Sequence, residues 1–192
     1  MTHALFDRKK SCLVVIDVQQ YFLDKLPPEW RAPLVARIGW LIGLARALDI
    51  PVIATAEDVV NDGPLVPELV KELPPNTIVH DKMVFGLCGQ PSILEAIRKT
   101  GRMEFVLVGL ETDVCIAHSA IGLMEQGFRV AVIEDATASP PPCHESGLRR
   151  VTAAGATITT AKGIYYEWLR DLETLYGTRK TFNPPLPPGL TL

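Results

Sequence analysis

Apolar, largely β-branched runs recur along the chain and are separated by polar or helical segments. The four strongest runs are 12–18, 51–56, 103–110 and 129–135. Two weaker runs, 77–79 and 156–160, each follow a turn signal. Continuous apolar runs are typical of parallel strands, because helices cover both faces of a parallel sheet. The pattern therefore predicts about six buried strands.

Helical spacing of apolar residues fills most of the intervals between these runs. The segments with this spacing are 32–48, 91–100, 112–126 and 144–154. Alternation of strand and helix implies right-handed crossovers and a mostly parallel sheet. We therefore predict an α/β fold with three layers, α/β/α, built on a doubly wound, mostly parallel six-stranded sheet of the Rossmann-like kind.

The final segment, 183–192, does not fit this alternation. It reads NPPLPPGLTL, and its prolines lack the amide donor that regular structure needs. We expect a tail there, after one folded domain over residues 1–182, since 192 residues suit a single domain.

The apolar residues of this tail and of the segments 86–91 and 121–124 exceed what one small domain needs to cover. A homo-oligomer is therefore expected.

Composition and charge narrow the class of protein. The chain has 47% hydrophobic and 21% charged residues, which is typical of a folded globular protein. Its formal net charge of -3 offers no basic surface to a nucleic acid or an anionic membrane, so the expected partner is a small molecule. The longest apolar runs fall far below the roughly 20 residues that span a bilayer. The first residues contain no apolar secretory segment, and a cytoplasmic location is the expectation.

Residues with catalytic chemistry follow three of the expected strands. In an open parallel sheet, ligands bind beyond the carboxyl ends of the strands. Asp17 stands where the first apolar run leaves the core, Lys82 follows the run at 77–79, and Cys115 falls in the first turn of the helix expected at 112–126. A helix start favours the thiolate, which is the nucleophilic form of cysteine. We therefore expect the pKa of Cys115 to be lower than that of an ordinary cysteine.

These three side chains have separable roles in acyl transfer. Asp17 would accept the thiol proton, Lys82 would stabilise the thiolate and keep Asp17 ionised, and Cys115 would attack a carbonyl carbon. Backbone amides of the strand-to-helix turn would bind the oxyanion. The result would be an acyl enzyme that water then cleaves.

Each residue also has a structural interpretation. Asp17 could cap a loop, Cys115 could be a small buried hydrophobe, and Lys82 could be a solvated surface lysine. His118 lies three residues after Cys115 on nearly the same helical face, so a Cys–His dyad is a rival arrangement. A non-catalytic nucleotide- or small-molecule-binding oligomeric module is a further alternative, although the first strand runs into DVQQYF and not into a glycine fingerprint.

Several motifs in register resemble the isochorismatase-like cysteine hydrolases. They are VVIDVQQYF at Asp17, KMVFG from Lys82, GLETDVCIAHSA at Cys115, and EQGFRVAVIEDATAS followed by a helix that begins with His144. The motifs occur in the family's order and cover most of the chain. The resemblance implies the family's hydrolase domain over 1–182 and assigns its triad to Asp17, Lys82 and Cys115.

The resemblance also implies details around the nucleophile. The family often has a non-proline cis peptide bond before the cysteine, and Glu111-Thr112 would be that bond. The amides of Glu111 or Thr112, with that of Cys115, would then form the oxyanion hole.

Residues near two of the expected strand ends are candidates for binding the substrate. We expect Gln19, Phe22 and Phe85 to contact it. For Phe22, Phe85 and Trp30 an ordinary core position is an equally open interpretation, because aromatic residues near strand ends often pack in the core.

Two comparisons within the family narrow the reaction. Members that cleave the vinyl ether of isochorismate generally lack the cysteine, so Cys115 favours hydrolysis of a small amide or related C–N bond, with the vinyl-ether reaction as the alternative. Nicotinamidases carry a metal site with an Asp-x-His pattern after the second strand, where this chain reads ATAEDVVNDGPLVPEL. Glu57, Asp58 and Asp62 alone make a poor transition-metal set. We therefore expect no metal and no other cofactor, as in the metal-free branch that NDGPLVPEL resembles, whose members often form larger homo-oligomers.

Overall fold

The sheet is built from six strands, all parallel, in a computed structural model that describes residues 5–192. The strands are β1 (Ser11–Ile16), β2 (Val52–Glu57), β3 (Val79–Lys82), β4 (Glu104–Leu110), β5 (Arg129–Ala138) and β6 (Thr157–Thr159). Their order is β3-β2-β1-β4-β5-β6, and every neighbouring pair is parallel. The predicted α/β fold with a parallel six-stranded sheet is confirmed.

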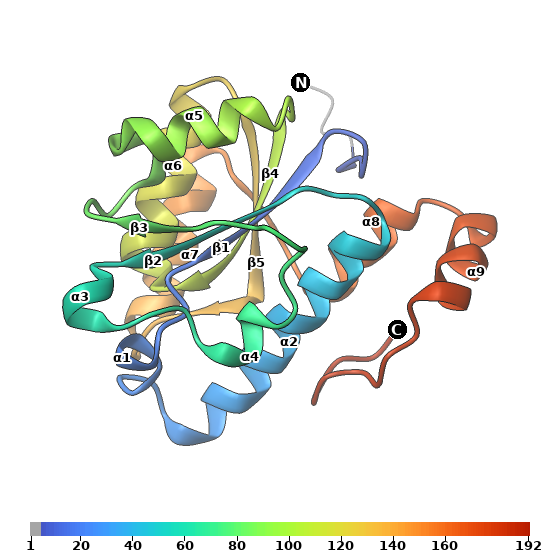
Figure 1. The fold of residues 1–192 in the computed structure, drawn as a ribbon, viewed down its shortest axis with the longest axis horizontal. Helices are drawn as coiled ribbons and strands as arrows, with labels where there is room; N and C mark the ends of the chain where they lie inside the picture. The colour runs from blue at the N-terminus through green and yellow to red at the C-terminus, as the bar shows by residue number, and fades with distance from the viewer. Residues whose placement is uncertain (1–4) are drawn as a thin grey trace.

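Helices cover both faces of this sheet (Figure 1). One face carries α2 (Pro28–Ala47), α4 (Pro67–Val70) and α8 (Ala161–Leu169), and the other carries α5 (Pro91–Lys99), α6 (Ala117–Glu125) and α7 (Cys143–Ala154). Shorter elements connect them: α1 (Gln20–Leu23), α3 (Val59–Asp62), the 3₁₀ turn η1 (Leu87–Gly89) and the π-type turn η2 (Thr112–Ile116). The last helix is α9 (Leu172–Thr181).

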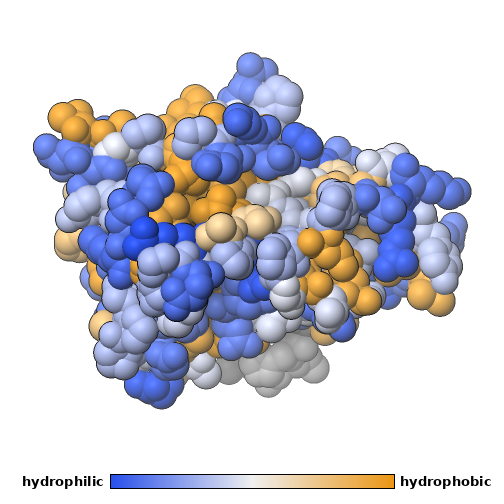
Figure 2. All heavy atoms as spheres, turned by 90° about the horizontal axis from the view of Figure 1, so that it is seen from below, coloured by the Kyte–Doolittle hydropathy of each residue, from blue (hydrophilic) through white to orange (hydrophobic). Residues whose placement is uncertain are grey.

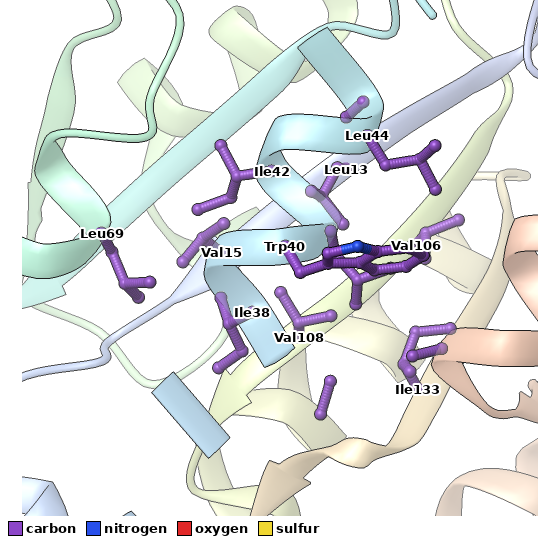
Figure 3. Close-up of a cluster of buried hydrophobic side chains, with 14 of the residues drawn as sticks. Leu13, Val15, Ile38, Trp40, Ile42, Leu44, Leu69, Val106, Val108 and Ile133 are labelled. Atoms are coloured by element: carbon purple, nitrogen blue, oxygen red, sulfur yellow. The ribbon is translucent and has the colours of Figure 1, made fainter. Parts of the chain in front are cut away.

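Side-chain alternation along the strands fills two separate cores. Leu13 and Val15 of β1 belong to the core under α2, whereas Val14 and Ile16 belong to the core under α5 and α6. Figure 3 shows the first of these cores, with Trp40 of α2 lying across the strand residues. Full burial of each aliphatic side chain contributes about 1.5–3 kcal/mol. Because both faces of the sheet are covered in this way, the strands read as continuous apolar runs.

Several elements differ from the expected ones in their boundaries, and two helices were not expected. The helix expected at 32–48 begins at Pro28, because proline is well suited to the first helical position. The weak strand expected at 77–79 is Val79–Lys82, so Lys82 ends the strand instead of following it. The sequence pattern gave no indication of α8 and α9.

The strand order reverses between β1 and β4. From β1 the chain winds outward to β2 and β3, and from β4 it winds the other way to β5 and β6. Ligands of doubly wound sheets bind at this reversal, beyond the carboxyl ends of the strands. The residues that follow β1 and β4 are therefore the ones to inspect.

The C-terminal tail, 183–192, contains no helix or strand and returns alongside α2 (Figure 1). Arg37 of α2 donates a hydrogen bond to the carbonyl of Pro188 at 2.8 Å, and Leu190 is buried. The tail therefore packs on the domain as an arm. Among the helices of residues 5–192, none is long and apolar enough to cross a membrane.

Candidate active site

Three strand ends place charged groups side by side. Asp17 directly follows β1, Glu57 ends β2 and Lys82 ends β3. The parallel register pairs Glu57 with Lys82, and the amide of Asp17 donates to the carbonyl of Thr55 at 3.1 Å. Cys115 lies in η2, which follows β4 on the other side of β1. The sheet thus brings the three predicted residues together and adds a fourth, Glu57.

The ammonium of Lys82 is fully buried among acceptors. Its Nζ lies 2.7 Å from Glu57 Oε2, 2.6 Å from the carbonyl of Val84, 3.0 Å from Asp17 Oδ2 and 3.7 Å from Cys115 Sγ. Burial by itself lowers the pKa of Lys82, but the charges of Asp17 and Cys115 and the hydrogen bonds that the ammonium donates to the two carboxylates raise it above its ordinary value. Lys82 is therefore a permanent cation of the site and not a surface lysine.

Asp17 is the enclosed carboxylate of the group. Its Oδ1 accepts a hydrogen bond from Thr55 Oγ1 at 2.7 Å, and its Oδ2 forms the ion pair with Lys82 but receives no well-aligned hydrogen bond. Burial raises the pKa of Asp17, against the opposing effects of Lys82 and Thr55. Its backbone has φ 52°, in the left-handed region that a non-glycine residue rarely adopts. Such conformations cluster at functional sites.

Cys115 lies in an irregular start of the helix that the pattern predicted. The carbonyl of Glu111 accepts from the amides of both Val114 and Ile116, at 3.2 and 3.1 Å, which gives η2 its wide π-type turn. In the part of the chain that the structure describes, the amides of Glu111 and Thr112 donate to no protein acceptor. The oxyanion hole predicted from Glu111 or Thr112 with the amide of Cys115 stays a prediction, and these two N–H groups would be free to serve in it.

The cis peptide bond of this turn was predicted one residue too late. It joins Leu110 to Glu111, and not Glu111 to Thr112. The reason is that β4 ends at Leu110, so the chain changes direction directly after that residue.

Neighbouring elements hold the turn from two sides. Ser139, after β5, donates its hydroxyl to Asp113 Oδ1 at 2.7 Å. Thr112 Oγ1 lies 2.9 Å from His144 Nδ1 of α7. A Cβ on Gly147 of α7 would stand 2.7 Å from the amide nitrogen of Asp113, so only glycine permits this close contact. The turn η2, which carries Cys115, is therefore held between the end of β5 and α7.

The thiol of Cys115 is only 3% exposed and donates a hydrogen bond to Glu57 Oε2 at 3.1 Å. Its pKa is raised, contrary to the expectation from the sequence. Burial is the largest cause and the charge of Asp17 the next, while Lys82 acts in the opposite direction. The expectation was wrong because the turn does not begin as a regular helix and two carboxylates surround the thiol. Cys115 therefore rests as a thiol with an acceptor already beside it.

Gln19 has a different position from the one expected. Its side chain is fully buried, and its Nε2 donates to the carbonyls of Glu57 and Gly63 at 2.7 Å each. Its Oε1 accepts from the amide of Glu57 at 2.6 Å. Because these bonds occupy both N–H groups and the carbonyl oxygen, Gln19 fixes the end of β2 and does not face a substrate.

The aromatic candidates lie in different surroundings. Phe22 is buried in the core under α2, with Lys25 Nζ 4.5 Å from its ring centre. Phe85 is 55% exposed and meets the ring of His118 edge-on. Their contact with a substrate stays a prediction. His118 makes no polar contact with Cys115 among the described residues, so the geometry does not favour a Cys–His dyad.

Sequence reasoning missed Glu57 and Thr55 as members of the site. Glu57 was considered only as a weak metal ligand, although it stands one residue beyond the predicted strand 51–56. The rule that selected Asp17, a carboxylate at a strand end, would also have selected Glu57. The hydroxyl of Thr55 gave no comparable signal, since threonine is common inside strands.

Ligand atoms of Asp17, Glu57 and Cys115 lie within 4.8 Å of one another, as they would around a metal ion. They already surround Lys82 Nζ, which forms ion pairs with both carboxylates. A metal ion among these donors would stand next to a buried ammonium and be repelled by it. The donor set therefore fits the lysine and does not fit a metal.

Comparison with known proteins agrees with this architecture. The sequence model of the family described as "Isochorismatase domain" matches residues 11–163. "Probable hydrolase YcaC" of Escherichia coli K12 is 27% identical over 179 residues, which are 88% of this chain and 84% of the relative. The MAR1 ribonuclease structure from Caenorhabditis elegans has a TM-score of 0.84 at 26% identity and covers 98% of both chains. The YcaC gene product of Escherichia coli, an octameric hydrolase of unknown specificity, has a TM-score of 0.82 at 24% identity and covers 96% of this chain and 93% of that one.

Proposed function

Because the chain belongs to the isochorismatase family and is a hydrolase of that family, we propose that it cleaves a small amide or related C–N bond through a thioester on Cys115. The observation that supports this most is the surroundings of the thiol. Its sulfur lies 3.1 Å from a carboxylate oxygen and 3.7 Å from a buried ammonium, and the amides of Glu111 and Thr112 at the start of the same turn have no acceptor within residues 5–192. A nucleophile, a proton acceptor and oxyanion donors are the three components of acyl transfer.

The reaction begins with transfer of the thiol proton to a neighbouring carboxylate, for which the sequence nominated Asp17. Cys115 Sγ then attacks the carbonyl carbon, and the amides of Glu111 and Thr112 bind the resulting oxyanion. Lys82 balances the negative charge that develops on the buried sulfur. As the intermediate collapses, the C–N bond breaks and the carboxyl group passes its proton to the nitrogen, which leaves as a neutral amine. Water then attacks the thioester, the C–S bond breaks, and the proton that water loses returns to the sulfur through the same carboxylate.

The vinyl-ether reaction finds less support here. That chemistry protonates an enol ether and forms no bond to sulfur, so it gives Cys115 no role. A thiol held between Lys82 and Glu57 is better explained by covalent catalysis.

We also propose that the protein works as a homo-oligomer bound to a small-molecule substrate. An apolar groove of about 660 Å³ runs between α2, α4 and the C-terminal tail, and Trp40, Leu69, Phe182 and Leu186 line it. Figure 2 shows apolar surface exposed between polar side chains on the side seen from below. The segments 86–91 and 121–124 contribute less than expected, because Leu87 and Leu123 are buried in the same core of this chain.

A substrate panel tests the proposed chemistry. Small aliphatic amides, N-carbamoyl compounds and ureas would be incubated with wild type and with Cys115→Ala, and amine or ammonia release measured. We expect release by the wild type alone. Isochorismate and RNA belong in the panel, the latter because the Caenorhabditis elegans neighbour is called a ribonuclease. Turnover that is equal in Cys115→Ala, on any of these compounds, would contradict the proposal.

A further inference from the structure

Lys82 lies on β3, the edge strand of the sheet, so within residues 5–192 only one side of its backbone is paired with another strand. Toward β2, Lys82 pairs with Glu57, and its carbonyl accepts from the amide of Asp58 at 3.1 Å. Backbone groups alternate in direction along a strand, so the carbonyl of Asp81 and the amide of Met83 point away from the sheet. These outer groups of an edge strand are left unpaired unless something else binds them.

The side chain of Gln90 binds both of these outer groups. Its Oε1 accepts from the amide of Met83 at 2.9 Å, and its Nε2 donates to the carbonyl of Asp81 at 2.8 Å. In a parallel sheet, one residue of a neighbouring strand makes the same two bonds, to the residues before and after the one with which it pairs. Here that central residue is Lys82. The carboxamide of Gln90 therefore takes the place of a further strand at the position of the site lysine.

Gln90 is itself held at the start of α5. Its backbone carbonyl accepts from the amides of Ile93 and Leu94, at 3.0 and 3.1 Å. Side chains in this N-cap position often bond the first amides of the helix, but the side chain of Gln90 makes no such bond. Ile93 is fully buried in the core under α5 and α6. The carboxamide thus reaches β3 from a helix start that packing holds in place.

The two hydrogen bonds of Gln90 lie next to the contacts of the ammonium. Met83 separates Lys82 from Val84, whose carbonyl accepts from Lys82 Nζ at 2.6 Å. A Cβ on Gly89 would stand 3.4 Å from the side chain of Val84, so the segment before Gln90 packs against this residue. Binding of the Met83 amide therefore fixes the backbone from which the lysine side chain extends, together with one of its acceptors.

We propose that Gln90 is a positioning residue that sets the place of the Lys82 ammonium beside the thiol of Cys115. The hydrogen bonds of its side chain go to the backbone on either side of Lys82 and to Ser92 Oγ, so it acts on the reaction through the lysine. This inference deepens the proposed function and rests on it for the effect on turnover.

The place of the ammonium matters because Lys82 is the cation that faces the thiol, while Asp17 and Glu57 are the anions that face it. Lys82 Nζ lies 3.7 Å from Cys115 Sγ. For two unit charges near this distance, at an effective dielectric constant of about 20, each further ångström lowers the thiolate population about fivefold. A small displacement of Lys82 should therefore cause a measurable change in the reactivity of Cys115.

The test measures alkylation of Cys115 by iodoacetamide at about pH 9, mapped by peptide mass spectrometry. Because burial and the carboxylates raise the pKa of this thiol, the rate there follows its small thiolate fraction. Gln90→Met keeps the length of the side chain but loses both hydrogen bonds, and its rate should fall at least about threefold. Gln90→Asn has the same carboxamide on a shorter chain and should lie between wild type and Gln90→Met.

Gln126→Met is the matched control for this substitution. The side chain of Gln126 accepts from Arg98 Nη2 at 2.7 Å on the exposed surface, away from β3. This variant should alkylate at the wild-type rate. Urea unfolding of all variants shows that each is folded under the conditions of the alkylation.

A double-variant cycle separates positioning of Lys82 from a general loosening of the edge strand. Loosening alone would change the access of iodoacetamide to Cys115 by the same factor with or without the ammonium. If Gln90 acts through Lys82, Gln90→Met should change the rate by less than about 1.5-fold in the Lys82→Met background. An equal factor in both backgrounds, or faster alkylation in Gln90→Met, would overturn the inference.

A second measurement keeps the test decisive if Lys82→Met does not fold. Iodoacetate and iodoacetamide have nearly the same size, but only iodoacetate is an anion that the ammonium attracts. The ratio of their rates at Cys115 cancels both access and thiolate fraction. This ratio should fall at least about twofold in Gln90→Met and stay at the wild-type value in Gln126→Met. An unchanged ratio in Gln90→Met would show that the ammonium has not moved and would overturn the inference.

The alkylation rates need no substrate, which separates this inference from the proposed function. A wild type inactive on the amide panel would count against the proposed hydrolysis, while the alkylation rates would still decide the role of Gln90. On an amide that the wild type hydrolyses, Gln90→Met should lower kcat/KM at least about threefold, because less thiolate is available for attack. A kcat/KM equal to that of the wild type would contradict the effect on turnover.

Discussion

Replacing Lys82 by methionine removes the cation that forms the ion pair with the buried carboxylate of Asp17. Methionine keeps a flexible unbranched chain, so the change is mainly one of charge. Removing one partner of a buried ion pair costs about 3–5 kcal/mol, because the other charge stays buried without compensation. Domains of ordinary stability unfold with about 5–15 kcal/mol, so Lys82→Met should lose a large part of its free energy of unfolding.

The loss should depend on pH in a defined direction. Burial already raises the pKa of folded Asp17, and removing Lys82, which lowers it, raises it further. A raised folded-state pKa means that the folded protein binds this proton more tightly than the unfolded chain does. The penalty of Lys82→Met should therefore be smallest near the unfolded value of about pH 4 and grow as the pH rises through the folded pKa.

Urea unfolding of wild type and variant at about pH 4.5 and about pH 7 measures this difference. Lys99→Met is the matched control, because Lys99 pairs with Glu95 at 2.7 Å on the exposed surface. This variant should leave the free energy of unfolding nearly unchanged. The double variant Asp17→Asn/Lys82→Met should recover part of the loss, since only the partly exposed carboxylate of Glu57 then lacks the ammonium. A loss in Lys82→Met below about 1 kcal/mol at both pH values would refute the buried ion pair.

Three further predictions follow from the same contacts. Gly109→Ala should lower the free energy of unfolding by more than about 3 kcal/mol in urea titrations, because its φ is 122° and a Cβ would lie 2.0 Å from the carbonyl oxygen of Ile16. Gly147→Ala should change the alkylation rate of Cys115 at least about threefold while the protein still unfolds cooperatively, since a Cβ there would press on η2 through Asp113. An unchanged rate would contradict the close contact between α7 and η2. In the wild type, the main rise in alkylation of Cys115 should lie above the ordinary cysteine pKa of about 8.5, because burial and the carboxylates raise the pKa of this thiol; a rise centred below that value would contradict the geometry.

The sequence could predict that Asp17, Lys82 and Cys115 lie close together, because the topology of the sheet constrains their positions. Asp17, Lys82 and Cys115 each stand at the carboxyl end of a strand or in the turn after it, and a doubly wound parallel sheet collects these ends at one edge. No side-chain detail is needed for that conclusion. The same rule applies to Glu57, which stands at the end of β2, so the sequence also contained the signal for this residue.

Other features depend on contacts that a single sequence does not reveal. The raised pKa of Cys115 results from burial and from two carboxylates that approach only in the folded chain. The role of Gln19 follows from the loop that brings Gly63 next to the end of β2. The helices α8 and α9 lacked a clear signal, since their boundaries depend on packing against the first core and on side-chain caps by Thr160 and Asp171.

The central claim is that hydrolysis passes through an acyl group on Cys115. Acid quenching during turnover of p-nitrophenyl acetate or of an active amide, followed by peptide mass spectrometry, detects that intermediate directly. The account predicts an acyl mass on the peptide that contains Cys115, sensitive to hydroxylamine as a thioester is, and neither acylation nor turnover in Cys115→Ala. Turnover that continues in Cys115→Ala, or a wild type that turns over rapidly with acylation only on Cys12, Cys88 or Cys143, would contradict it.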